Sequence, residues 1–215
     1  NAETHGRVDT AAKLEGLPVI PRKKLFYKGK EVEEMDLQAI LQIHPEVVIV
    51  DELAHTNIEG CVNEKRWQDV LDLLDAGINV ITAVNIQHIE SLNDTVASIT
   101  GVMVRERIPD SVFDGAEQVE LVDIEPEDLL KRLREGKVYR EVQAERAVNN
   151  FFTLENLTAL REIALRRCAD RVNLLVENAR LKTHANYHTD EHVLVCLSSA
   201  PSNAKIVRTG ARMAA

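Results

Sequence analysis

The residues of this 215-residue sequence best suited to chemistry are two adjacent carboxylates, Asp51 and Glu52, and one amide, Asn85. The two carboxylates follow directly on residues 47–50, an apolar run in which every residue is β-branched. Such a run is too short for a helix and predicts a strand that is buried on both faces. Open α/β sheets bind their ligands beyond the carboxyl ends of the strands, which is where these two carboxylates are expected.

An apolar strand that ends in two carboxylates matches the Walker B motif of nucleotide hydrolases. The aspartate there holds Mg²⁺, commonly through water, because this ion takes hard oxygen ligands and keeps part of its hydration. The glutamate can polarise the attacking water as a general base. We therefore interpret Asp51 as a candidate Mg²⁺ residue and Glu52 as a candidate catalytic residue. The alternative is that polar residues end a buried strand here for structural reasons alone.

Asn85 ends a second predicted strand, residues 78–85. Its side chain could sense a terminal phosphate from the adjacent crevice, or it could cap the helix that begins near Ser91. With Asp51 and Glu52 it makes up the predicted nucleotide-binding set.

The sequence lacks the phosphate-binding loop that would complete such a site. A Walker A loop reads Gly-x-x-x-x-Gly-Lys-Ser/Thr, and its backbone N–H groups and lysine neutralise the phosphates. None of the nine glycines fits this pattern, since Lys24 stands in place of the first glycine before Gly29 and Lys131 stands there before Gly136. We therefore expect no tight nucleotide binding by this segment alone.

Composition excludes several other functions. The chain carries a formal charge of −9, whereas nucleic-acid binding needs clustered cations. No apolar run approaches the ~18–20 residues that cross a bilayer. The three cysteines form no C-x-x-C pair, which argues against a zinc site or a disulfide framework. His184, His188 and His192 could share a helix face, but the polar residues between them predict a linker.

Apolar runs alternate with amphipathic ones, which predicts βαβ units and a mainly parallel sheet. A long helix is expected over residues 154–182, and a new strand and helix over 192–197 and 204–215. The other expected strands are 47–50, 78–85, 102–105 and 119–123, and the other expected helices are 36–43, 64–76, 89–99 and 127–135.

Several longer segments resemble the cytoplasmic N-terminal region of the KdpD sensor histidine kinases. They occur in the expected order at residues 3–7, 20–24, 34–37, 50–57, 65–70 and 85–94, with further likeness at 136–139 and 156–162. Two features depart from the family pattern. The family's Walker A loop precedes the segment at residues 3–7. In place of the family's basic loop after Thr56 and Asn57, this chain has residues 58–62, whose one charged residue is the acidic Glu59.

The resemblance implies a P-loop-NTPase-like α/β domain over residues 1–182, here without its first strand and P-loop. It further implies a linker at 183–191 and the start of a universal-stress-protein-like domain at 192–215. In some relatives that second domain binds cyclic di-AMP. We carry no such site over, because most of that domain is not in this sequence.

The resemblance also implies a parent protein in the inner or plasma membrane, with this segment on its cytoplasmic face. Such proteins bind ATP and Mg²⁺, respond to potassium limitation and osmotic stress, and phosphorylate a response regulator that controls a potassium-transport operon. We therefore interpret the chain as a non-catalytic regulatory input segment whose partner is the rest of the kinase. A strand edge left exposed without the first strand could also pair with a second copy as a non-native dimer. The alternatives are an ATP-hydrolysing domain with Glu52 as general base and a non-catalytic docking module.

Overall fold

The computed structural model describes residues 2, 4, 8–135, 151–183, 195–197 and 203–214. The chain divides into two compact units, Asn1–Glu162 and Ile163–Ala215, and each is described by itself. In the described part of the chain, no helix is both long enough and apolar enough to cross a membrane.

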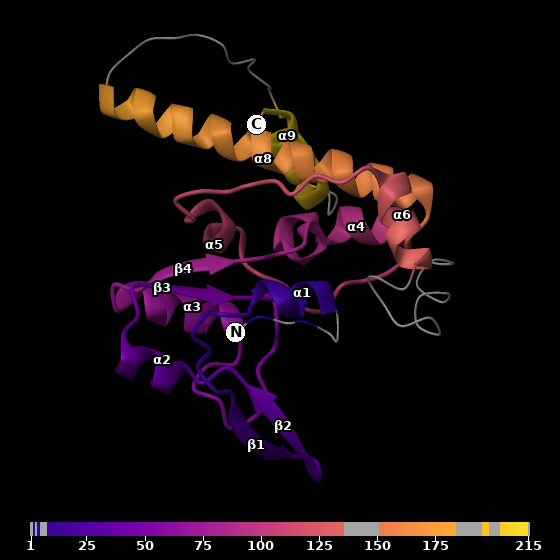
Figure 1. Ribbon diagram of the computed structural model, residues 1–215. Coiled ribbons are helices and arrows are strands. Elements are labelled where there is room, and N and C mark those ends of the chain that lie inside the picture. Colours follow the sequence, from indigo (N-terminus) through magenta and orange to yellow (C-terminus); the bar gives the residue numbers. More distant parts are fainter. Residues whose placement is uncertain are drawn as a thin grey trace. The chain divides into compact units, whose positions relative to one another are not determined.

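The first unit combines helices with one antiparallel and one parallel pair of strands (Figure 1). Its strands are β1 (Lys23–Tyr27), β2 (Lys30–Glu34), β3 (Val47–Val50) and β4 (Asn79–Thr82). Its helices are α1 (Val8–Lys13), α2 (Leu37–Ile43), α3 (Arg66–Asp75), the 3₁₀ turns η1 (Ile86–His88) and η2 (Glu90–Leu92), α4 (Asn93–Thr100), α5 (Asp110–Asp114), α6 (Pro126–Arg134) and the start of α8 (Leu154–Thr183). The α/β class expected from the alternating pattern is confirmed.

β3, α3 and β4 form the βαβ unit that the sequence predicts. The two strands run parallel, with Val47 opposite Asn79 and Val50 opposite Thr82. α3 is followed by Gly77, whose φ of 82° is a left-handed conformation that glycine adopts without steric cost. Because β3 and β4 are parallel and in register, their carboxyl ends meet at one edge of the sheet.

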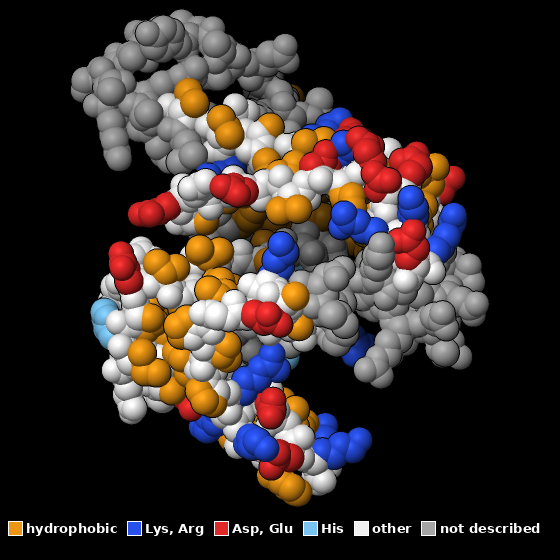
Figure 2. Space-filling model, in the orientation of Figure 1, with side chains coloured by type: hydrophobic (Ala, Val, Ile, Leu, Met, Phe, Trp, Pro, Cys, Tyr) orange, Lys and Arg blue, Asp and Glu red, His pale blue; other side chains and the backbone are white. Residues whose placement is uncertain are grey.

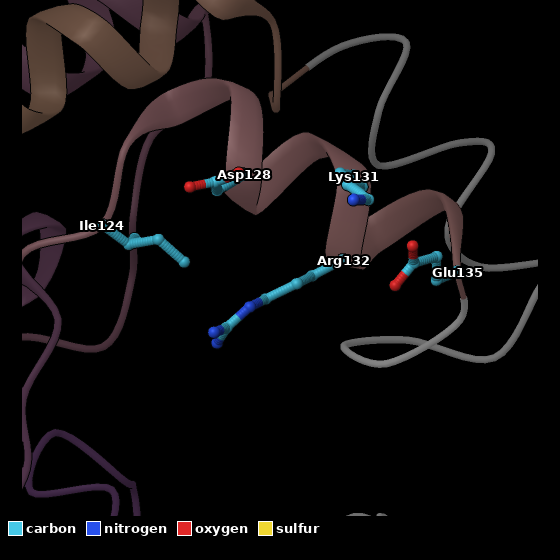
Figure 3. A pocket seen from close by; sticks show the side chains of 5 residues that line it. All are labelled: Ile124, Asp128, Lys131, Arg132 and Glu135. Atoms are coloured by element: carbon cyan, nitrogen blue, oxygen red, sulfur yellow. The ribbon is translucent and has the colours of Figure 1, made fainter.

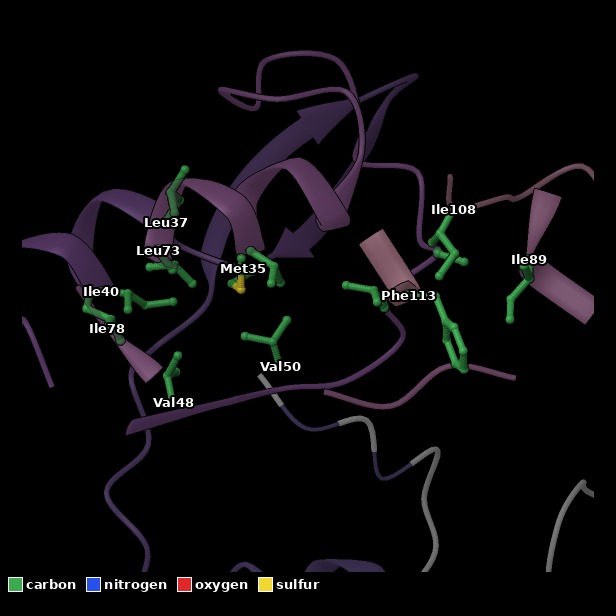
Figure 4. Close-up of a cluster of buried hydrophobic side chains, with 13 residues drawn as sticks. Met35, Leu37, Ile40, Val48, Val50, Leu73, Ile78, Ile89, Ile108 and Phe113 are labelled. Carbon is green, nitrogen blue, oxygen red and sulfur yellow. The ribbon is translucent and has the colours of Figure 1, made fainter. Parts of the chain in front are cut away.

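The core lies between one face of β3 and the helices α2 and α3. Figure 4 shows Val48 and Val50 pointing from β3 toward Met35, Leu37 and Leu73. Val50 and Leu73 are fully buried. This packing fixes the position of β3 relative to α2 and α3. It thereby also fixes the position of the residues that follow the strand.

The prediction that β3 is buried on both faces is wrong. Val48 and Val50 are buried, whereas Val47 and Ile49 are 47% and 44% exposed, and Ile81 of β4 is 60% exposed. The helices cover only one face of this two-stranded sheet among the described residues. A continuous β-branched run shows that both faces can be buried, but it does not supply the element that buries the second one.

The predicted strands 102–105 and 119–123 do not form. Both segments lack regular hydrogen bonding in the structure, and Val122 is 91% exposed. A strand needs a neighbour for its backbone groups. Near these segments the structure has only a single bridge, between Ile89 and Ile108. The antiparallel β1–β2 hairpin, in contrast, was not expected from the sequence.

The second unit contains the rest of α8 and the helix α9 (Asn203–Ala214). Both helices agree with the predicted ranges 154–182 and 204–215. Residues 195–197 of the predicted strand have no regular structure, and residues 192–194 lie outside the described residues, as do His184, His188 and the linker residues 184–191. The stress-protein-like assignment therefore stays a prediction.

Arg161 ties the start of α8 to the segment before α6. Its guanidinium donates to both carboxylate oxygens of Asp123, at 2.6 and 2.8 Å, and to those of Glu125, at 2.6 and 2.9 Å. These hydrogen bonds from Arg161 lower the pKa of Asp123 below its ordinary value of 3.8. The stabilisation is therefore complete above pH 3.8 and is lost as the pH falls through the lowered pKa.

We expect the substitution Arg161→Met to lower the melting temperature at pH 7, and expect this difference from wild type to shrink as the pH falls below 3.8. Thermal unfolding across this pH range measures it. The variant Arg105→Met, which removes another exposed arginine, is the control. A difference that stays constant across the whole range would contradict the role of Asp123.

Candidate functional site

The structure brings the three sequence-predicted residues to one pocket. This β3–β4 pocket has a volume of about 100 Å³ and lies beyond the carboxyl ends of the two strands. It is lined by Asp51, Glu52, Leu53, Ala54, His55, Ala83, Val84, Asn85, His88 and Glu106. Parallel strands in register are the reason that Asp51 and Asn85, 34 positions apart in the sequence, reach the same cavity.

The chain turns sharply at Glu52, the residue after Asp51. Glu52 has a φ of 54°, which is rare for a residue with a side chain. Its N–H donates to Asp51 Oδ1 at 2.9 Å, and its carbonyl accepts the N–H of His55 at 2.9 Å. The N–H of Leu53 donates a hydrogen bond to the carbonyl of Ala83, which follows β4, at 3.1 Å. A left-handed residue beside a pocket is typical of positions that are constrained by function.

We expect the left-handed conformation of Glu52 to reverse the usual order of glycine and alanine substitutions. Glu52→Gly should be about 1 kcal/mol more stable than Glu52→Ala, because the left-handed region costs a residue with a Cβ about that much. At Lys131, an exposed position inside helix α6, the Ala variant should instead be the more stable by about 1 kcal/mol. Chemical denaturation of the four variants measures this, and the same order at both positions would contradict the turn.

Two buried charged residues lie next to the residues that line the pocket. Arg66 and Glu34 are only 2% and 3% exposed. Arg66 Nη1 donates to the backbone carbonyl of Asp51 at 3.1 Å and lies 3.7 Å from Glu52 Oε2, while Arg66 Nη2 donates to Glu34 Oε2 at 3.3 Å. His55 Nε2 lies 3.0 Å from Glu34 Oε1. Through these contacts of Arg66 with Asp51 and Glu52, the buried cluster holds the turn after β3 in place.

Sequence reasoning missed the cluster of Glu34 and Arg66. Each lies inside a segment that resembles the sensor family, but a charged residue at the end of a strand or the start of a helix is usually solvated. The available signal was the position of Arg66 in the first turn of α3, where a cation is unfavourable beside the helix dipole and therefore needs a reason.

Glu106 adds a third carboxylate to the pocket. Its Oε1 accepts the N–H of Thr56 at 3.0 Å, and its backbone carbonyl lies 2.9 Å from His88 Nδ1. The pocket therefore holds three acidic side chains, those of Asp51, Glu52 and Glu106. A lining of this kind favours a cation. Sequence reasoning did not single out Glu106, although this residue directly follows residues 102–105, which were expected to form a strand.

The pocket contains no ready-made metal cage. No group of three or more histidine, cysteine, aspartate or glutamate side chains within the described residues is arranged to hold a metal ion. Mg²⁺ usually binds through one or two carboxylates and completes its shell with waters and phosphate oxygens. A volume of about 100 Å³ is below the 300–1,000 Å³ of typical small-molecule sites. It has room for a hydrated ion and a phosphate end, not for a whole nucleotide.

Asn85 lines the pocket and does not cap a helix, which was the alternative role that the sequence allowed. It precedes η1, and its side chain makes no capping hydrogen bond there. The N–H and hydroxyl of Ser91, where the helix was expected to begin, instead bond to the carboxylate of Asp110 at 3.0 and 2.6 Å. The amide of Asn85 is thus placed among the pocket residues and is not used as a helix cap.

The loop that follows the pocket is held at its other end by Asp69. The carboxylate of this buried residue accepts the side-chain amides of Asn57 at 2.7 Å and Asn63 at 2.9 Å. Burial raises the pKa of Asp69 above its ordinary value, and the two amides oppose that rise. The acidic segment 58–62, which departs from the family pattern, lies between these anchored asparagines.

A larger hollow of about 310 Å³ lies beside α6, but its charged side chains do not point toward a common position. Figure 3 shows Lys131 and Arg132 extending in different directions from neighbouring positions of the helix, with Asp128 and Glu135 also spread along it. Two acids and two bases give this hollow no net preference for an ion. The β3–β4 pocket, with its single sign of charge, is the better candidate site.

Comparison with known proteins gives a consistent result. The family described as "KdpD: Osmosensitive K+ channel His kinase sensor domain" matches residues 1–172. Proteins named "Sensor protein KdpD" from Clostridium acetobutylicum, Escherichia coli K12 and Mycobacterium tuberculosis H37Rv are 56%, 51% and 49% identical over 214 residues. The matches cover 99% of this chain but only about a quarter of each relative, at 24%, 24% and 25%. With most of its length matched by the family, the chain belongs to the KdpD family of sensor domains.

Proposed function

We propose that this chain is a regulatory input segment of a sensor histidine kinase and that the β3–β4 pocket receives the Mg²⁺-bearing end of ATP. In the longer protein, Asp51 would hold Mg²⁺ through water and Asn85 would lie near the terminal phosphate. The phosphate-binding loop would come from sequence that precedes residues 3–7, as the family pattern implies. The three acidic residues that line the pocket, Asp51 and Glu52 after β3 and Glu106 from the segment after α4, are the observation that carries this proposal.

The wider function that we propose rests on the family to which the chain belongs. The parent protein would respond to potassium limitation or osmotic stress, with this segment on the cytoplasmic face, and would phosphorylate a response regulator that controls a potassium-transport operon. Nucleotide in the pocket would shift the balance of kinase states only if it binds one state more tightly than another. Because this segment spans about a quarter of its relatives, the rest of the kinase is its first partner.

The geometry of Glu52 supports an input role over ATP hydrolysis. A general base must reach the attacking water. Glu52 instead has one carboxylate oxygen 3.7 Å from buried Arg66, and its backbone is held in a left-handed turn. Its side chain is still 40% exposed and lines the pocket, so hydrolysis remains the second candidate to be tested.

The test is a titration of the longer protein with ATP, in the presence and absence of Mg²⁺. The melting temperature and the release of phosphate are measured at each ATP concentration. An input site predicts a Mg²⁺-dependent rise in melting temperature with no phosphate release above background. Steady release that Glu52→Gln abolishes would establish the hydrolase instead. A melting temperature that nucleotide does not change would overturn both the input site and the hydrolase, and would favour a docking module.

A further inference from the structure

The β3–β4 pocket is lined by acids, yet the phosphate end of a nucleotide is itself an anion. The ionised carboxylates of Asp51, Glu52 and Glu106 accept hydrogen bonds and donate none. Mg²⁺ can neutralise part of the charge, but phosphate oxygens also take hydrogen bonds from protein donors. On the face that Figure 2 shows, the Lys and Arg side chains of the described residues lie among Asp and Glu side chains. The donors for a phosphate are therefore to be found among the residues that line the pocket.

Three lining side chains can donate a hydrogen bond, those of His55, Asn85 and His88. The amide of Asn85 carries no charge. His55 Nε2, the ring nitrogen further from the backbone, already lies 3.0 and 3.1 Å from the two carboxylate oxygens of buried Glu34. His88 Nε2, in contrast, has no hydrogen-bond partner among the residues that the structure describes, because the ring contact of His88 is made by Nδ1. His88 is thus the lining residue that can offer a phosphate a charged donor.

His88 is held in place by both its ring and its backbone. Its Nδ1 lies 2.9 Å from the backbone carbonyl oxygen of Glu106. Its own carbonyl accepts the N–H of Ile108 at 2.8 Å, and its N–H donates to the carbonyl of Asn85 at 3.0 Å. An imidazole that is positioned before the ligand arrives loses less conformational entropy on binding.

The contact with Glu106 decides which nitrogen carries the proton when His88 is neutral. A carbonyl oxygen only accepts hydrogen bonds, so Nδ1 is protonated and Nε2 has a lone pair, which cannot donate to a phosphate oxygen. When the ring takes up a second proton, Nδ1 keeps its bond to Glu106 and Nε2 becomes a charged donor. Such charge-assisted hydrogen bonds are about twice as strong as neutral ones.

The ionisable residues on the elements that adjoin His88 are mostly acidic. The carboxylates are those of Asp51, Glu52, Glu90, Asp94 and Glu106, and the other groups are His55, Arg105 and Arg107. Neither arginine lines the pocket, and Arg107 Nε donates to the carbonyl of Val104 at 3.1 Å. Among the described residues of the pocket, His88 is therefore the group through which the proton concentration can act on a bound phosphate.

We propose that His88 binds the terminal phosphate of the nucleotide through Nε2 and that this contact couples nucleotide binding to the uptake of a proton. The coupling rests on the proposed function, because it needs a nucleotide in the β3–β4 pocket. Histidine side chains gain and lose their proton between pH 5 and 8. Since the protonated ring binds, the gain in affinity is present at the acidic end of this range and is lost as the pH rises.

The test is calorimetric titration of the longer protein with ATP and Mg²⁺ at pH 6, 7 and 8. We expect the affinity to be about tenfold weaker at pH 8 than at pH 6, because a charge-assisted hydrogen bond is lost with the proton. Repeating the titration at pH 7 in buffers with different heats of ionisation counts the protons. About 0.5–1 proton should be taken up for each ATP bound, and ADP, which lacks the terminal phosphate, should bind without this uptake.

The variant His88→Asn removes the donor at Nε2 and keeps the anchor, because an asparagine amide can donate to the carbonyl of Glu106 as Nδ1 does. It should bind ATP about tenfold more weakly than wild type at pH 6 and nearly as well at pH 8, without proton uptake. The matched control is His44→Asn. His44 Nε2 also lies 2.9 Å from a backbone carbonyl, that of Ala76, but His44 is exposed at the end of α2 and does not line the pocket. This control should bind like wild type at each pH.

Failure of this coupling and failure of the proposed function give different results. Mg²⁺-dependent ATP binding with the same pH dependence and proton uptake in wild type and His88→Asn would overturn the role of His88 and leave the nucleotide site standing. Proton release with tighter binding at pH 8 would also overturn it and would assign Nε2 to the metal ion, whose ligands must be deprotonated. No ATP binding at any pH would overturn both the coupling and the proposed function.

Discussion

Replacing Arg66 with methionine is expected to lower the free energy of unfolding by about 3–5 kcal/mol, the largest effect of any single substitution considered for this chain. Methionine fills much of the same volume but leaves the carboxylate of Glu34 buried without its guanidinium partner. It also removes the donor to the carbonyl of Asp51, so the turn at the pocket should loosen. Chemical denaturation of the wild type and variant measures the change.

Two controls separate burial from charge alone. Lys24→Met breaks the exposed pair with Glu31, whose side chains are 62% and 57% exposed, and should cost less than about 1 kcal/mol. Adding Glu34→Gln to Arg66→Met removes the stranded charge and should recover a substantial part of the loss. If Arg66→Met costs no more than Lys24→Met, the buried cluster does not support the pocket.

The substitution Asp51→Asn in the longer protein is expected to weaken Mg²⁺-dependent ATP binding by about 10–100-fold, as is usual for residues that hold a metal through its outer shell. Asparagine keeps a side-chain oxygen that can accept the N–H of Glu52, as Asp51 Oδ1 does at 2.9 Å. The turn should therefore survive while the charge is lost. Calorimetric titration with and without Mg²⁺ measures the effect.

The control for Asp51→Asn is Asp75→Asn, the same change at an exposed position at the end of α3. This variant should bind Mg²⁺ and ATP like wild type. ATP binding without Mg²⁺ should change little in Asp51→Asn, because the substitution acts through the ion. Unchanged Mg²⁺-dependent binding in Asp51→Asn would show that the Walker B interpretation is wrong.

The sequence predicts the part of the fold that depends on local pattern. The β-branched run 47–50, the amphipathic segment that becomes α3 and the stop at Gly77 are sufficient to predict the βαβ unit. From that unit it follows that Asp51 and Asn85 meet, because parallel strands bring their carboxyl ends to one edge. The location of the pocket could thus be predicted from the periodicity of the sequence and the topology of the βαβ unit.

The rest depends on contacts between distant residues. Residues 102–105 have the composition of a strand, but whether they form one depends on a neighbouring strand that local pattern cannot supply. The same holds for the exposed face of β3 at Val47 and Ile49. Arg66 and Glu34 are 32 positions apart, and their burial together follows only once α3 packs above the end of β2.

The most direct test of the central claim is to locate the metal. Crystals of the longer protein grown with Mn²⁺ and a non-hydrolysable ATP analogue would reveal the ion by its anomalous scattering, because Mn²⁺ takes the same oxygen ligands as Mg²⁺. We predict a metal peak in the β3–β4 pocket, on the order of 4 Å from the carboxylate of Asp51, as contact through one water requires. A bound analogue whose metal lies elsewhere, with no metal in this pocket, would contradict the account.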